Sequence, residues 1–161
     1  MQRAPQYGAM PSGDRFMAEA LALSASALPA CHPNPPVGCV LVDGDQVVAR
    51  GFTGPPGTPH AEAAALLDLA ALRARGSVID PRALTAYVTL EPCSFHGRTP
   101  SCALALIAIG VPRVVVATID PHPKNRGRGI QLLRDAGVEV VVGTLEREVL
   151  AFIGPHLLVN G

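Results

Sequence analysis

The sequence predicts an α/β domain of three layers, in which helices cover both faces of a mixed five-stranded sheet. The chain has 161 residues, a length that suits one domain. Two β-rich runs, 37–42 and 47–52, flank the turn residues 43–46 and predict an antiparallel hairpin. Beyond residue 86, strand and helix patterns alternate, which favours parallel neighbours joined by right-handed crossovers. A hairpin beside parallel strands makes the expected sheet a mixed one.

The first half of the chain is expected to contain a helix, the hairpin and a second helix. Residues 1–13 are polar, rich in Gly and Pro and without periodicity, so we interpret them as a flexible tail before a domain of residues 14–161. Asp14 can cap a helix whose apolar residues recur at helical spacing, and the prolines between 29 and 36 end it. After the hairpin, the pattern at 61–75 predicts a helix closed by Gly76.

The second half of the chain alternates strands and helices without an internal repeat or a linker. The predicted elements are a strand at 86–90, a helix at 101–109, a strand at 113–119, a helix at 129–136, a strand at 138–142 and a helix at 146–153.

One acidic residue and three possible zinc ligands form the pattern most informative about function. His60, Cys93 and Cys102 can supply one imidazole and two thiolates, which leaves the fourth position of a tetrahedral zinc open for chemistry. Zinc in such a site makes hydroxide available near neutral pH. Glu62 follows two residues after His60 and can move protons between water, a ring nitrogen and departing ammonia, as in zinc deaminases. These four residues predict a zinc-dependent hydrolytic deaminase.

The positions of these residues along the predicted elements agree with a shared site. Residues two apart on a regular helix point about 200° away from each other, so His60 and Glu62 serve one pocket only at a helix start. Cys102 also begins a predicted helix, where the helix dipole favours a thiolate. Ligands in open α/β sheets collect beyond the carboxyl ends of strands, where Cys93 and Asp120 emerge. For Cys31 and Cys39, in or before apolar strand sequence, we expect a packing role.

Composition excludes several kinds of partner. The chain has 13 basic and 13 acidic residues and no basic run, which argues against a polynucleotide partner. Only six aromatic residues, none of them Trp, are available to stack exposed bases. Apolar runs end well short of the roughly 20 residues that a membrane span requires. No signal-peptide pattern is present, so we expect a cytoplasmic enzyme that acts on a small molecule, away from membranes.

Four segments carry a resemblance to a known family. They are Asn-Pro-Pro-Val-Gly-Cys-Val at 34–40, Pro-His-Ala-Glu at 59–62, Glu-Pro-Cys-Ser-Phe-His-Gly-Arg-Thr-Pro-Ser-Cys at 91–102 and Asp-Pro-His-Pro at 120–123. Their order, and the eight residues between the paired cysteines, resemble the deaminase domain of the bifunctional riboflavin-biosynthesis deaminase/reductase over residues 14–143. The resemblance implies a cytidine-deaminase-like fold, Zn²⁺ as cofactor, and a homodimer or homotetramer. It also implies deamination of 2,5-diamino-6-ribosylamino-4(3H)-pyrimidinone 5′-phosphate.

The same resemblance implies substrate contacts outside the metal group. It places Asn34 against the pyrimidine, and Arg98 and Lys124 near the substrate phosphate. His96 either contacts the substrate or orders its own loop. The basic residues that follow Lys124 either cradle a phosphate or are solvated.

Three further positions depart from the family pattern, and we count them among the substrate contacts. Phe95 stands where the riboflavin enzymes usually have His, His122 where they have Asn, and Thr53 where many have His. These departures leave open the same chemistry on another base or nucleoside, such as cytosine, guanine or another aminated heterocycle. A non-catalytic zinc module is the third interpretation. The sequence ends before the family's reductase domain, which fits a separate deaminase, a piece of a longer protein, or a relative recruited to another substrate.

Overall fold

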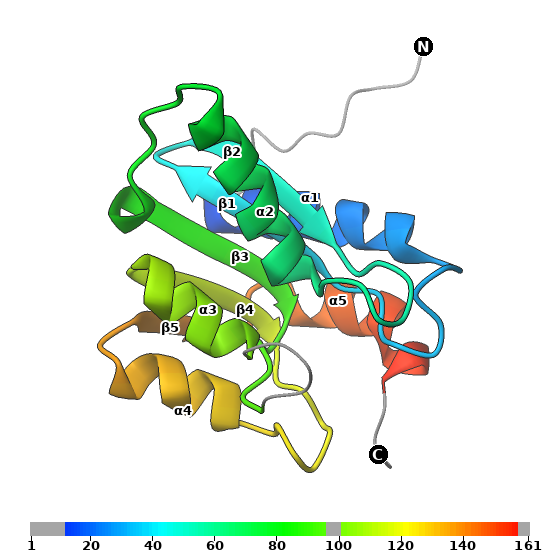
Figure 1. The fold of residues 1–161 in the computed structure, drawn as a ribbon. Coiled ribbons are helices and arrows are strands. Elements are labelled where there is room, and N and C mark those ends of the chain that lie inside the picture. The colour runs from blue at the N-terminus through cyan, green and yellow to red at the C-terminus, as the bar shows by residue number, and fades with distance from the viewer. Residues whose placement is uncertain (1–11, 96–100, 158–161) are drawn as a thin grey trace.

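Five strands form one mixed sheet in the order β2-β1-β3-β4-β5 in the computed structural model, which describes residues 12–95 and 101–157 (Figure 1). β1 pairs antiparallel with β2 and with β3, and β4 is parallel to both β3 and β5. The strands span Gly38–Asp43 (β1), Gln46–Phe52 (β2), Leu84–Leu90 (β3), Arg113–Thr118 (β4) and Glu139–Val142 (β5).

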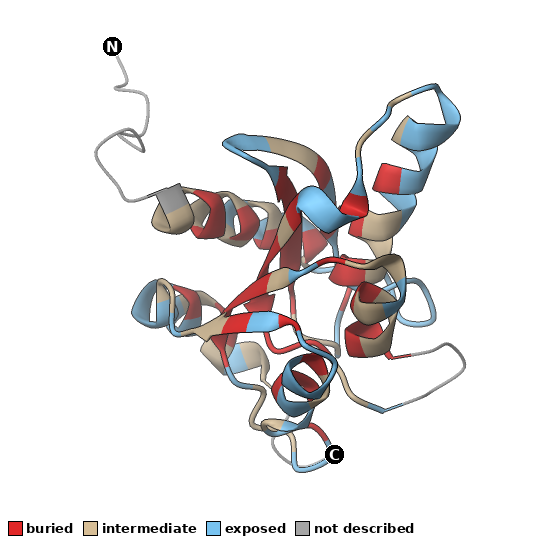
Figure 2. Ribbon diagram, turned by 90° about the vertical axis from the view of Figure 1, so that its left-hand side faces the viewer, coloured by how far each residue is buried: buried red, intermediate tan, exposed pale blue. Residues whose placement is uncertain are grey.

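Helices cover both faces of this sheet. α2, α3 and α4 lie on one face and α1 and α5 on the other, so the predicted three-layer α/β/α architecture is confirmed (Figures 1 and 2). Buried residues are concentrated in the sheet and on the helix sides that face it (Figure 2). The helices span Ser12–Ser24 (α1), Ala61–Ala74 (α2), Cys102–Ile109 (α3), Arg128–Asp135 (α4) and Glu146–Ile153 (α5), with short 3₁₀ turns at Ala25–Ala27 (η2), Pro81–Ala83 (η3) and Gly154–His156 (η4).

Two element starts differ from the sequence-based expectation. α1 begins at Ser12, so Asp14 lies within its first turn, where a carboxylate stabilises the helix dipole, and Asp14 is not the cap residue. β3 begins two residues before the predicted position because Asp80 caps η3, after which Leu84 pairs directly with Asp43 of β1. The other elements with predicted bounds agree to within one residue at each end.

Close packing of α2 on β2 sets the height of the helix start above the sheet. A Cβ atom at Gly51 would overlap the Ala61 carbonyl oxygen and the Ala65 backbone nitrogen, so only glycine permits this approach. Leu69 of α2 is fully buried in the same layer. Because Ala61 directly follows His60, the contact at Gly51 also places the first predicted metal ligand.

The remaining core is built from aliphatic side chains of the central strands and the inward sides of the helices. Within residues 12–95 and 101–157, no helix has the length and apolar character needed to cross a bilayer. The largest fully buried side chains include Met17, Leu41, Leu84, Leu106, Leu133 and Ile153.

Candidate active site

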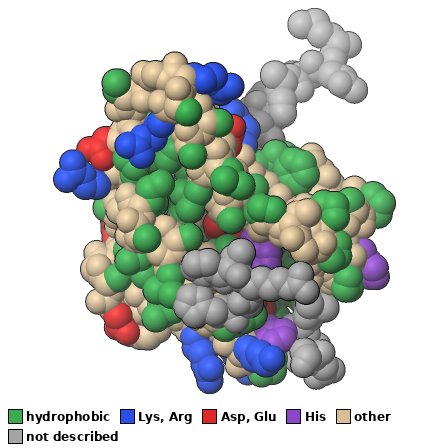
Figure 3. Space-filling model, in the orientation of Figure 1, with side chains coloured by type: hydrophobic (Ala, Val, Ile, Leu, Met, Phe, Trp, Pro, Cys, Tyr) green, Lys and Arg blue, Asp and Glu red, His purple; other side chains and the backbone are tan. Residues whose placement is uncertain are grey.

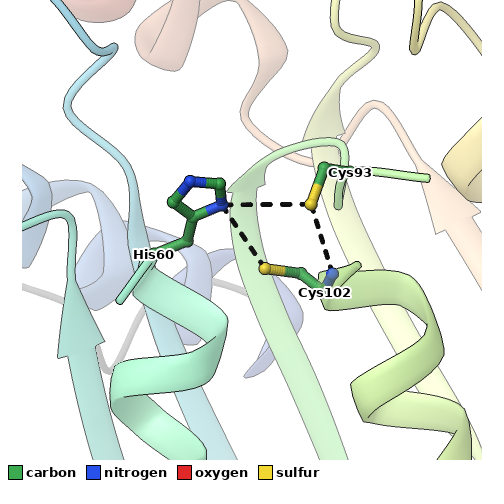
Figure 4. Close-up of side chains that lie close together, drawn as sticks. All are labelled: His60, Cys93 and Cys102. Atoms are coloured by element: carbon green, nitrogen blue, oxygen red, sulfur yellow. Dashed lines mark hydrogen bonds between the residues drawn. The ribbon is translucent and has the colours of Figure 1, made fainter. Parts of the chain in front are cut away.

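The three predicted metal ligands converge at the carboxyl end of β3 (Figure 4). His60 precedes the first turn of α2 in an extended conformation, Cys93 follows β3, and Cys102 is the first residue of α3. The Nδ1 atom of His60 lies 3.6 Å from the Sγ of Cys102 and 3.9 Å from the Sγ of Cys93. All three ligand atoms lie within 4.8 Å of one another. The predicted placement at two helix starts is confirmed.

These separations match the edges of a tetrahedral zinc site. Zn–N bonds of about 2.0 Å and Zn–S bonds of about 2.3 Å give N–S edges of roughly 3.5 Å. Among the described residues, no fourth His, Cys or acidic side chain joins the group. A donor set of one nitrogen and two sulfurs with an open position is typical of catalytic zinc, whereas structural zinc sites are closed by a fourth ligand.

The two cysteines differ in acidity in the metal-free state. A hydrogen bond with the Cys102 side chain is the largest cause that lowers the pKa of the Cys93 thiol to about 4. Burial opposes this shift, and a hydrogen bond with His60 adds to it. The same hydrogen bond, together with burial, raises the pKa of Cys102. The backbone N–H of Cys102 also donates to the Cys93 sulfur at 3.2 Å. Metal ligation requires both cysteines as thiolates, so binding of a metal would release the proton that Cys102 retains.

Glu62 lies in the first turn of α2, beside the ligands and almost fully buried, with 4% of its surface exposed. Burial, followed by the nearby Cys93 charge, raises the pKa of its carboxyl from 4.5 to about 7. A carboxyl that titrates near neutral pH can both accept and donate a proton during turnover, which is the property that a general acid/base requires.

A cavity of about 260 Å³ opens beside the metal group and Glu62. Four residues predicted as substrate contacts line it: Asn34, Thr53, Phe95 and His122. The rings of Phe95 and His122 lie 6.3 Å apart and are tilted by 34°, so the two departures from the family pattern form one wall. His122 Nδ1 accepts a hydrogen bond from the Lys124 backbone N–H, which leaves Nε2 of the neutral ring to carry the proton.

Thr53 also has a structural role, and Lys124 lines a different cavity. Thr53 is buried, and its hydroxyl oxygen accepts the Val37 N–H at 3.0 Å, so it ties the end of β2 to the chain that enters β1 as well as lining the cavity. Lys124 is exposed and lines a second cavity of about 360 Å³, shared with Phe95 and Arg128. His96 and Arg98 lie outside the described residues. Cys31 and Cys39 are both buried, as expected for packing residues.

Two residues that organise the site received no role from the sequence. The Glu91 carboxylate is buried and accepts backbone N–H groups of Asp120, Gly127 and Ile130 at 2.9–3.1 Å. Asn125 is buried and bonds to the segment around Cys93. The sequence signal that could have identified Glu91 is an acidic residue directly after an apolar strand. A carboxylate buried at such a position requires several hydrogen-bond donors.

Comparison with known proteins places the chain among deaminases. Residues 10–118 match the family described as the cytidine and deoxycytidylate deaminase zinc-binding region. The riboflavin biosynthesis protein RibD of Escherichia coli (strain K12) is 47% identical over 83% of this chain, which spans 34% of that protein. The chain thus spans about a third of the length of such curated RibD relatives. A diaminohydroxyphosphoribosylamino-pyrimidine deaminase of Buchnera aphidicola subsp. Schizaphis graminum is 40% identical and is covered over 87% of its length.

Solved structures of deaminases also resemble this chain. A Thermotoga maritima diaminohydroxyphosphoribosylaminopyrimidine deaminase/5-amino-6-(5-phosphoribosylamino)uracil reductase matches with a TM-score of 0.80 at 40% identity, over 89% of this chain and 39% of that one. The Aspergillus oryzae Rib2 deaminase matches with a TM-score of 0.70 at 26% identity, over 90% of this chain and 92% of that one. Fold, site geometry and sequence thus agree that the chain belongs to the cytidine and deoxycytidylate deaminase family, in the branch of the RibD deaminases.

Proposed function

We propose that this chain is a zinc-dependent hydrolytic deaminase whose substrate is 2,5-diamino-6-ribosylamino-4(3H)-pyrimidinone 5′-phosphate. The observation that carries the proposal is the placement of His60, Cys93 and Cys102 beside the buried Glu62 at one end of one cavity. The 40% identity to a relative named for this type of pyrimidine deaminase supports the substrate class.

The metal group and Glu62 divide the chemistry between them. Nδ1 of His60 and the two thiolates would hold Zn²⁺, which when bound would supply a Lewis acid and a nucleophilic water at neutral pH. The Glu62 carboxylate takes a proton from the attacking water and gives it to the ring nitrogen. It then takes the second proton of the water from the hydroxyl group now on the ring carbon and delivers it to the departing amino group, which leaves as ammonia. In the metal-free chain, burial is the largest cause that raises the pKa of this carboxyl to about 7.

The two cavities fit the two ends of such a substrate. The cavity beside Glu62 is large enough for a pyrimidine ring, with Asn34 and the Nε2 proton of His122 as polar contacts and Phe95 as an apolar one. Phe95 also borders the second cavity, where Lys124 and Arg128 provide positive charge for a phosphate. The ribosyl phosphate therefore extends past Phe95 toward α4.

The same chemistry on another base or nucleoside is the second candidate, and the Phe95–His122 wall is the observation that favours it. This wall replaces a His and an Asn of the family pattern and alters both the shape and the hydrogen-bonding groups of the cavity. A nucleic-acid substrate is less favoured. On the face shown in Figure 3, Lys and Arg side chains form separate groups near its margins without a continuous basic patch.

Self-association completes the proposal. α3 carries apolar residues around most of its circumference, and Leu104, Ala105 and Ile107 are only half-buried in one copy of the chain. Leu67 on the neighbouring α2 is 60% exposed. An apolar surface of this kind is typical of an oligomer interface, in agreement with a homodimer or homotetramer. Light scattering after size exclusion tests it: a monomer at micromolar concentration would contradict this part of the proposal.

The substrate proposal is tested by ammonia release from zinc-loaded protein. The diaminopyrimidine phosphate is compared with its dephosphorylated form, cytidine, cytosine, guanine and guanosine. We expect rapid turnover of the first compound and weaker turnover without its phosphate. Turnover of another base alone would assign the same chemistry to a different substrate. The single substitutions Phe95→His and His122→Asn, which restore the residues of the family pattern, would then show which wall residue changed the specificity.

A further inference from the structure

A single buried amide lies between the metal group and the cavity wall. Asn125 has no exposed surface, and it belongs to the turn between β4 and α4, 32 residues along the chain from Cys93. Its side-chain oxygen accepts the Ser94 N–H at 2.9 Å, and its side-chain nitrogen donates to the Pro92 carbonyl at 3.2 Å. The amide thus bonds to the residues immediately before and after Cys93.

The backbone of Cys93 has little freedom under these contacts. Its carbonyl accepts the Ala103 N–H at 3.1 Å, and its sulfur accepts the Cys102 N–H. The start of α4 closes the other side, because a Cβ atom at Gly129 would overlap the Pro92 carbonyl. α3 on one side and Asn125 on the other therefore hold the Cys93 backbone where its Sγ lies 3.9 Å from the Nδ1 of His60.

The same amide also reaches the cavity wall. Its nitrogen lies 3.3 Å from one carboxylate oxygen of Asp120, while the other oxygen of Asp120 accepts the His122 N–H at 3.0 Å. The carbonyl of His122 in turn accepts the Asn125 N–H at 2.9 Å. The His122 backbone, which carries the ring beside Phe95, is therefore tied to the Asn125 side chain through Asp120.

We infer that Asn125 is a positioning residue with two effects. It orients the Cys93 thiolate toward the metal, and it fixes the distance between the metal and the His122 side of the Phe95–His122 wall. This inference rests on the proposed function only in taking a metal to be bound by His60, Cys93 and Cys102. Outer partners of metal ligands commonly influence metal affinity by about 10- to 100-fold because they orient the ligand. Asn125 is such a partner, acting through the peptide groups on either side of Cys93.

The test uses cobalt(II) as a spectroscopic probe and zinc competition with a chelator. We expect Asn125→Ala to weaken zinc binding by about 10- to 100-fold and to shift the thiolate-to-cobalt absorption bands. We also expect kcat to fall and KM to rise, because both the metal ligand and the wall are displaced. Ile153→Ala in α5, on the opposite face of the sheet, is the matched control: it removes a fully buried side chain and lowers Tm, but leaves the zinc Kd and the cobalt spectrum unchanged.

Asn125→Asp provides a second variant of nearly the same volume. It keeps the acceptor for the Ser94 N–H but loses the donor to Pro92 and sets a carboxylate against Asp120, so we expect an intermediate loss of zinc affinity and an altered cobalt spectrum. A zinc Kd and a cobalt spectrum equal to wild type in a folded Asn125 variant would overturn the inference. Both readouts are independent of turnover, so failure of the deaminase assay in wild-type protein would count against the proposed function and not against the role of Asn125.

Discussion

At the scale of single residues, Glu62 shows the conflict between stability and function. Its carboxyl is buried against a thiolate, and both conditions disfavour the charged form, which raises its pKa to about 7. Because the folded-state pKa lies above its ordinary value, the folded protein holds the proton more tightly than the unfolded chain does. The stability that this proton contributes is fully present below about pH 4.5 and is lost as the pH rises through about 7.

The metal-free Glu62→Gln variant should therefore be more stable than metal-free wild type at pH 8. A rise from 4.5 to about 7 corresponds to on the order of 3 kcal/mol, since one pKa unit is about 1.4 kcal/mol. Gln cannot ionise, so the difference between the two proteins should shrink toward pH 4.5. Urea unfolding at both pH values measures it, and a Gln variant less stable than wild type at pH 8 would contradict the account of this carboxyl.

At this scale, the sequence predicted the candidate site residues that can be recognised from their near neighbours in the chain. His60 and Glu62 were recognisable because their spacing works only at a helix start, and Cys102 because it begins a helix. The use of Nδ1 by His60 was not readable, since it depends on the ring's orientation. Asn125 and Glu91 were not assigned roles because the donors and acceptors they bond to lie about 30 to 40 residues away along the chain.

At the scale of elements, the Glu91 carboxylate joins the end of β3 to the loop after β4 and to the start of α4. α4 begins after Gly127 and has no side-chain cap of its own. The N–H groups of Gly127 and Ile130 bond to Glu91 instead, so a residue from another strand satisfies the open end of the helix. The negative charge also matches the positive end of the helix dipole.

Glu91→Gln should lower the free energy of unfolding by about 2–3 kcal/mol, because one charged acceptor is replaced by a donor that faces backbone N–H groups. In a chain of this length the loss corresponds to a fall in Tm of roughly 5–10 °C. Glu139→Gln is the control, because Glu139 forms an exposed ion pair with Arg113 at 3.3 Å. We expect the control to change the unfolding free energy by less than about 1 kcal/mol. Equal melting of the two variants in a thermal scan would refute the capping role of Glu91.

The ends of the helices and strands show where short sequence signals are sufficient to predict a boundary and where they are not. Gly110 adopts the left-handed conformation that ends α3, directly after the predicted helix at 101–109. The first residues of β3 were not expected as strand because η3 and the pairing with Asp43 of β1 determine them. That pairing joins segments about 40 residues apart, and no pattern within either segment contains it.

At the scale of the whole molecule, the metal group connects three separate parts of the chain. His60 belongs to the start of α2, Cys93 to the end of β3 and Cys102 to the start of α3. A metal bound by all three stabilises the folded state relative to the unfolded chain, which has no preformed site. Alternation of strands and helices predicted this arrangement, because the carboxyl ends of the strands meet at one edge.

Zinc removal should therefore lower Tm, and zinc addition should restore it. At a free zinc concentration a thousand times Kd, the expected stabilisation is about 4 kcal/mol. Cys102→Ala should abolish this zinc-dependent increase in Tm, whereas Cys31→Ala, a buried cysteine outside the metal group, should retain it. Scanning calorimetry with and without a chelator makes the comparison, and an equal zinc response in both variants would show that the metal binds elsewhere.

The most direct test of the central claim is to measure bound zinc and ammonia release together in the Glu62→Gln variant. Gln preserves the size of the side chain and removes its ability to carry a proton. We expect one zinc per chain, as in wild type, and turnover reduced by about 10²- to 10⁴-fold or more. A variant that keeps its zinc and releases ammonia at the wild-type rate would contradict the assignment of Glu62 as the proton carrier of a zinc deaminase.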